Sequence, residues 1–290
     1  SVAIGNLALA THVDGARNVA IGWEAMHDTN AGSTSQGSND NVFIGYIAGG
    51  GTWANAESNG NVGIGSYVMD SALDGALYNT AVGAYALSAI TQADNVVAIG
   101  NSAAYSLTTA SNNIAIGFSA MKVHTTGERN IAIGTNAMDD TDAGSTSLGS
   151  ADNVFIGHDA GGGTWADAAS SYNVGIGNYV MDSALDGATY NTAVGWVALS
   201  SVTTGDHNTT LGYRAGNGLT TGLYNVIIGS QAGDAASIGN YHVLIGAFAG
   251  TSINSTDADG TVAIGYQSAQ ILTSGIGSTA IGYQSLFTAT

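Results

Sequence analysis

The nine residues Asn18-Val19-Ala20-Ile21-Gly22-Trp23-Glu24-Ala25-Met26 decide the fold, because their centre recurs along the whole chain. Successive repeat glycines are 17 to 23 residues apart, and most of the intervals are 17 or 18 residues. A period near 20 residues is typical of solenoid proteins, in which each unit contacts only its neighbours. The sixteen repeat glycines are Gly5, Gly22, Gly45, Gly65, Gly83, Gly100, Gly117, Gly134, Gly157, Gly177, Gly195, Gly212, Gly229, Gly246, Gly265 and Gly282.

The residues before each repeat glycine predict a short strand. Val, Ile or Thr stands three residues before it, and Ile, Val or Leu stands one residue before it, as Ile21 and Ile133 do. Apolar, β-branched residues with a period of two indicate a strand. We expect these larger side chains to fill each coil and the small residues between them to face partner chains. Phe43 and Phe155, at the small position, do not fit this assignment.

Two further positions of the unit have structural roles. The repeat glycine, for example Gly22 or Gly134, is expected to adopt a positive φ or to admit a neighbouring backbone closely. Asn opens the unit in eleven copies, among them Asn18 and Asn130. In stacked coils these amides could form a hydrogen-bonded ladder, or each could stabilise only its own turn. A second short segment with small, buried side chains follows the glycine, so two short strands are expected per coil.

The sequence also contains a second, longer repeat. The pattern of intervals restarts 112 residues after Gly22, at Gly134, and the side chains repeat with it. We therefore predict one solenoid domain over residues 1–290, with duplicated blocks 22–133 and 134–245 and divergent trailing coils 246–290. The chain opens inside a repeat, so we expect it to be cut from a longer array.

The composition excludes several classes of partner. Four basic residues stand against twenty-one acidic ones, which gives a formal charge of −17. Nucleic acid and anionic membrane surfaces both require positive charge, so neither is expected to bind. No apolar run reaches the ~18 residues that a membrane span needs. The chain has no Cys, and hence no disulfide framework.

The longest intervals predict loops on one face, where solenoids commonly bind ligands. The 20-residue intervals contain Gly-Gly-Gly-Thr-Trp, and a Trp beside polar residues suits the stacking of a sugar. The alternative is that each Trp folds back and covers the core. The candidate ligand-binding residues are Trp53, Trp165, Asn30, Asp142, Thr52 and Thr164.

No cofactor is expected. Asp139, Asp140 and Asp142 could hold calcium together with loop carbonyls, but a solvated loop is the preferred interpretation. The chain contains none of the common nucleotide-binding, hydrolase or zinc motifs, and no two of its six histidines have a metal-ligand spacing. The sequence therefore predicts a protein that is not an enzyme.

The unit Asn-x-Ala-Ile-Gly-x-x-Ala-Leu/Met, often followed by Thr-Thr-Gly, resembles the head repeats of YadA-type trimeric adhesins. Its 17-residue spacing is similar to that of phage tail-fibre shaft repeats. The resemblance covers essentially the whole chain. It implies an all-β, left-handed parallel β-roll, or β-solenoid, of about sixteen coils, assembled side by side as a homotrimer. The unit is longer than is usual for YadA-type heads, which leaves the parent protein open.

These observations predict an extracellular attachment fibre, borne on a cell surface or a virion, that contacts a cell-surface glycan or another receptor through its loops. Two alternatives remain open. The first is a purely structural shaft. The second is a solenoid that binds ice through its Thr pairs, although most coils lack such a pair.

Overall fold

The computed structural model describes residues 1–29, 37–141, 149–253 and 256–289. The chain is an all-β parallel β-solenoid of about sixteen coils, as the repeat predicts. It divides into two compact units, residues 1–140 and 141–290, which are described separately below. Within the described ranges the only helical element is a single 3-10 turn, η1 (Thr256–Ala258).

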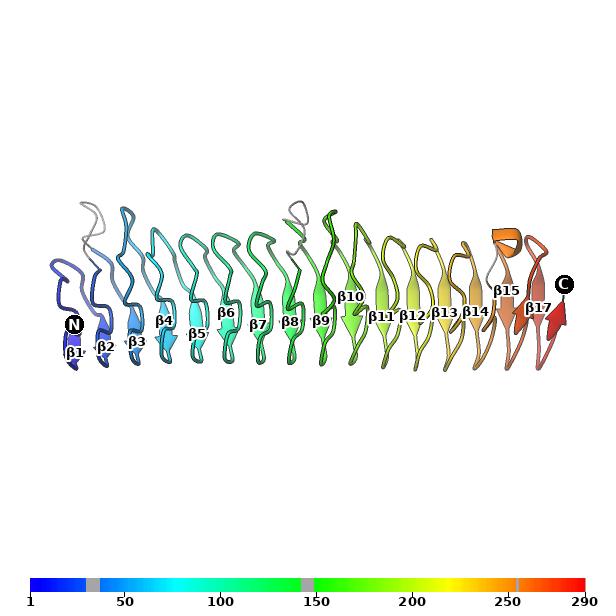
Figure 1. The fold of residues 1–290 in the computed structure, drawn as a ribbon, viewed down its shortest axis with the longest axis horizontal. Coiled ribbons are helices and arrows are strands. Elements are labelled where there is room, and N and C mark those ends of the chain that lie inside the picture. The colour runs from blue at the N-terminus through cyan, green and yellow to red at the C-terminus, as the bar shows by residue number, and fades with distance from the viewer. Residues whose placement is uncertain (30–36, 142–148, 254–255, 290) are drawn as a thin grey trace. The chain divides into compact units, whose positions relative to one another are not determined.

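In unit 1, each coil contributes one three-residue strand, and each strand pairs in parallel with the next along the chain (Figure 1). Equivalent positions of the repeat lie opposite one another, as in the pairing of Ala98 with Ala115. The strands are β1 (Val2–Ile4), β2 (Val19–Ile21), β3 (Val42–Ile44), β4 (Val62–Ile64), β5 (Thr80–Val82), β6 (Val97–Ile99), β7 (Ile114–Ile116) and β8 (Ile131–Ile133).

Unit 2 repeats this arrangement with the same register (Figure 1). A small second sheet joins β16 (Ile271–Leu272) to β18 (Thr288–Ala289). The main strands are β9 (Val154–Ile156), β10 (Val174–Ile176), β11 (Thr192–Val194), β12 (Thr209–Leu211), β13 (Val226–Ile228), β14 (Val243–Ile245), β15 (Val262–Ile264) and β17 (Thr279–Ile281).

The segment after each repeat glycine is a kinked turn, and within the described ranges a second strand per coil is found only at β16 and β18. Two of its residues have a left-handed backbone, such as Tyr85 (φ 60°) and Leu87 (φ 51°). Both still bond to neighbouring coils, because Tyr85 N–H donates to Ser66 O at 3.0 Å and Leu87 N–H donates to Ala103 O at 3.0 Å. The coils are thus hydrogen-bonded to one another on this side without a regular strand.

The assignment of strand faces made from the sequence is wrong. Ala20 and Ala132, at the small position, are fully buried inside the coil, whereas Ile21 and Ile133 are only partly covered on its outer side. The isoleucines do stack in one column, as Ile116 on Ile133 shows, but that column lies on the surface. The interior is filled by the small position together with apolar residues of the kinked turn, such as Met26.

This orientation explains Phe43. Its ring lies inside the coil, and a Cβ added at Gly49, six residues later, would come 2.8 Å from it. Where the strand contributes Ala or Gly, the turn usually contributes a large residue, as in Ala20 with Met26. Large strand residues face a turn glycine, in the pairs Phe43/Gly49, Phe155/Gly161, Thr210/Gly216, Ile227/Gly233 and Leu244/Gly250. The strand residue and the turn residue of a coil therefore share one interior volume. Where one of them is large, the other is small.

The opening asparagines form the ladder that was one of the two interpretations. Asn191 is buried, and its Oδ1 accepts hydrogen bonds from Asn208 N–H at 2.9 Å and from Asn208 Nδ2 at 3.0 Å. Its own Nδ2 donates to Gly205 O at 2.7 Å. The same bonds join Asn18 to Asn41 in unit 1. Each amide thus satisfies buried backbone groups of two coils, which is why Asn is repeated at this position.

Candidate functional site

Trp53 and Trp165 are core residues. Both side chains are fully buried, and their rings meet those of Phe43 and Phe155 edge to face at 5.9 Å. The Trp53 indole N–H donates to Gly49 O at 3.0 Å, which satisfies its one polar group. A buried ring cannot offer its face to a sugar, so the stacking platform expected at these two residues is wrong and the core-covering alternative describes them.

The other candidate ligand-binding residues do not converge on a site. Thr52 and Thr164 are exposed, and the Thr52 hydroxyl donates to the Asp28 carboxylate at 2.8 Å. Asn30 and Asp142 lie outside the described residues. Among the residues that the structure does describe, no group of three acidic or His side chains could hold a metal ion. The calcium hypothesis included Asp142, and it remains a prediction.

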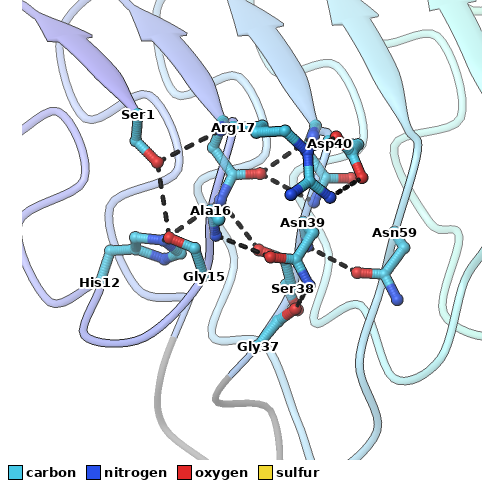
Figure 2. A network of polar contacts seen from close by, with 12 residues as sticks. Ser1, His12, Gly15, Ala16, Arg17, Gly37, Ser38, Asn39, Asp40 and Asn59 are labelled. Atoms are coloured by element: carbon cyan, nitrogen blue, oxygen red, sulfur yellow. Dashed lines mark hydrogen bonds and ion pairs between the residues drawn. The ribbon is translucent and has the colours of Figure 1, made fainter.

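A polar network lies at one corner of the first coils (Figure 2). Arg17 donates two hydrogen bonds to Asp40, at 2.5 and 2.7 Å, and this contact lowers the pKa of the Asp40 carboxyl. Beside it, Ala16 N–H donates to Asn39 Oδ1 at 2.7 Å (Figure 2). The pair joins two adjacent coils, but both partners are exposed, so it contributes little to stability.

The outer side of the sheet presents columns of apolar side chains in each unit. In unit 1, Ile64, Val82 and Ile99 are 39, 36 and 40% exposed, and in unit 2, Ile176 and Leu211 are 39 and 48% exposed. The strand alternation that buries the small residues directs these larger ones outward. Exposed apolar surface of this regularity marks an interaction face.

A row of stacked aromatic rings runs along unit 2, and sequence reasoning missed it. The residues stand five positions before the repeat glycine in five successive coils: Tyr172, Tyr190, His207, Tyr224 and Tyr241. Neighbouring ring centroids are 4.7 to 5.6 Å apart, and the ring planes lie within 3 to 8° of parallel. The signal in the sequence is the recurrence of Tyr or His at this one position when the repeats of unit 2 are aligned.

A buried titratable group, His242, follows the last asparagine of the ladder. His242 occupies the ladder position after Asn225 and is 1% exposed, and among the described residues its Nε2 has no hydrogen-bond partner. The backbone N–H of Thr261 donates to its Nδ1 at 3.3 Å, which requires that nitrogen to be unprotonated. Burial lowers the pKa of His242 below its ordinary 6.5, with a smaller opposing effect from Asp259.

Acid should therefore destabilise the coil around His242. Above pH 6.5 the ring is neutral in the folded and unfolded states, whereas below it the unfolded state binds a proton that the folded state resists. Protonation of His242 in the unfolded state should therefore lower the free energy of unfolding by up to about 1.4 kcal/mol for each pH unit below 6.5. His242→Asn introduces the residue that the preceding coils carry at this position, such as Asn225, and should remove this component. Urea denaturation of both proteins at pH 7.5 and 5.5 measures it, and an equal loss of stability in both would contradict the assignment.

The described residues contain no helix with the length and hydropathy of a membrane span, and no pocket is found among them. A comparison with protein-family models and with curated proteins finds no match to this chain.

Proposed function

We propose that this chain forms the shaft of a non-enzymatic, extracellular attachment fibre, carried on a cell surface or a virion, and that three copies of its left-handed roll pack side by side. The single observation that carries the proposal is the exposed apolar columns on the outer side of the sheet. The number three and the handedness come from the resemblance to adhesin heads and tail-fibre shafts.

Self-association follows from the periodicity of those columns. Burial of apolar surface contributes roughly 25 cal/mol per Å², so leaving such a face in water in coil after coil is costly. Because Val82 and Ile99 lie on consecutive strands in register, the face offers the same chemistry at every coil. Copies of one chain related by a rotation axis present such a face to one another without any further partner.

The fibre is proposed to attach to a cell-surface glycan. The acidic composition supports a solvated extracellular protein and argues against nucleic acid and anionic membranes. A purely structural shaft is the second candidate, and the burial of Trp53 and Trp165 favours it, because their loops lose their aromatic contact residues. The ice-binding alternative is weakened, since the Thr203 hydroxyl donates to Thr220 O at 3.3 Å in the next coil.

Charges placed on the outer face of the sheet should dissociate the assembly. Val82→Asp with Ile99→Asp adds two carboxylates to the apolar columns at positions that a single chain leaves 36 and 40% exposed. Sedimentation velocity should show a trimer for the unmodified chain and a folded monomer for this variant. The matched control, Asn95→Asp with Asn112→Asp, adds the same charge at exposed positions outside the sheet face and should remain trimeric.

An unmodified chain that sediments as a monomer would overturn the proposal, and so would equal dissociation of the variant and the control. A broad glycan array then separates the two functions. Binding supports the attachment fibre, whereas no binding favours the purely structural shaft.

A further inference from the structure

The aromatic row of unit 2, defined above by Tyr172, Tyr190, His207, Tyr224 and Tyr241, is exposed along its whole length. The four tyrosines are 49, 51, 50 and 60% exposed, although their rings have stacked neighbours. The outer edges of the rings, with their hydroxyl groups, therefore face solvent. The stacking also holds each ring in place, so that little side-chain entropy is lost when a ligand binds.

The backbone conformation does not require aromatic residues at these positions. Tyr190 and Tyr224 have φ values of 57° and 58°, in the left-handed region that bulky side chains rarely adopt and Asn tolerates well. At the same position of the repeat, unit 1 has Asn95 (φ 57°) and Asn112 (φ 62°). The scaffold thus accepts Asn here, and the aromatic side chains are explained by what they present to solvent.

The row is also not needed for contact between copies of the chain. The apolar columns proposed for self-association are found in both units. At the position of the aromatic row, unit 1 has a single aromatic residue, Tyr78, and its other residues there are Arg17, Asp40, Gly60, Asn95, Asn112 and Arg129. A surface confined to one unit is better suited to a ligand than to a repeated subunit contact.

The shape and chemistry of the row indicate the class of ligand. Five rings in file across five coils, with no pocket among the described residues, suit an extended polymer. Phenol hydroxyls and an imidazole both donate and accept hydrogen bonds, which matches the hydroxyl groups of sugars. Polar residues run alongside one position earlier, including Ser171, Thr189 and Asp206.

The negative charge of the chain excludes anionic polymers as ligands of the row. The Asp206 carboxylate lies beside the row, where it accepts from Thr189 N–H at 2.6 Å, and the whole chain carries a charge of −17. An anionic polymer would be repelled. We propose that the aromatic row binds a neutral polysaccharide laid along unit 2, an inference that rests on the attachment function proposed above and gives it a site.

Affinity electrophoresis of the full chain tests this proposal. The gels contain dextran, a β-glucan or a mannan as neutral polymers and hyaluronate as the anionic one. At least one neutral polymer should retard the chain, and Tyr190→Asn with Tyr224→Asn should weaken that retardation at least tenfold. The matched control is Tyr78→Asn in unit 1, a tyrosine at the same repeat position with similar φ (58°) whose neighbours in the column are Gly60 and Asn95. It should leave the retardation unchanged.

Three results would overturn the proposal: no retardation by any neutral polymer, equal retardation of the double variant, or retardation by hyaluronate alone. Sedimentation of the double variant should match the unmodified chain, and its dissociation would instead make the row a subunit contact. Because the row lies within one chain, a monomeric protein would refute the trimeric fibre while the electrophoresis still decides the polysaccharide site.

Discussion

Replacing Phe43 by alanine should lower the free energy of unfolding by about 3–5 kcal/mol, the range for truncating a buried phenylalanine. The ring is fully buried and packs edge to face on Trp53 at 5.9 Å, so the variant leaves a cavity in the middle of the coil. Urea denaturation followed by circular dichroism measures the loss.

A second substitution should restore part of this stability, because the interior volume is shared between strand and turn. Gly49 has φ 60°, close to the 50° of Met26 at the same repeat position, so its backbone already suits methionine. In the presence of Phe43, Gly49→Met should destabilise, since its Cβ would lie 2.8 Å from the ring. In the Phe43→Ala background it should stabilise by at least about 1 kcal/mol. If the effects of the two substitutions on the free energy of unfolding were additive, Phe43 and Gly49 would not share one interior volume.

Gly117→Ala should cost at least about 3 kcal/mol, because two penalties add at this position. Gly117 has φ +143°, which a residue with a side chain rarely adopts. A Cβ there would also lie 2.2 Å from the carbonyl oxygen of Gly134 in the next coil. Neither the backbone nor the stacked coil can move without breaking the hydrogen bonds between coils. Urea denaturation measures the loss, and a cost below about 1 kcal/mol would show that the coils are more loosely stacked than the structure indicates.

Gly282 provides the matched control for Gly117. It has a comparable φ of +122°, but an added Cβ meets no atom within 4 Å. Gly282→Ala should therefore show only the backbone strain, about 1–3 kcal/mol. The difference between the two variants measures the close approach of stacked glycines. Equal effects would mean that φ alone explains why the repeat requires glycine.

The arrangement of the candidate site was less predictable than the fold. The Gly-Gly-Gly-Thr-Trp loops drew attention to Trp53 and Trp165, but a loop glycine does not tell whether the following ring turns outward or inward. Here the ring turns inward, where it packs edge to face on Phe43 and its indole N–H donates to the Gly49 carbonyl. The aromatic row was equally visible in the sequence, yet only the stacked coils bring Tyr190 and Tyr224, far apart along the chain, onto one surface with His207 between them.

The sequence by itself determined the coil period, the strand in each coil, the parallel register and the positions of the repeat glycines and ladder asparagines. Each of these depends on local chemistry that recurs at a fixed spacing. Only the tertiary structure decided which strand face is inside. Alternation separates Ala20 from Ile21, but both faces are apolar, so the pattern assigns no direction to either. The kinked turn decides it, since a large turn residue such as Met26 occupies the interior and leaves room beside it only for a small strand residue, whereas a large strand residue such as Phe43 enters where the turn has a glycine.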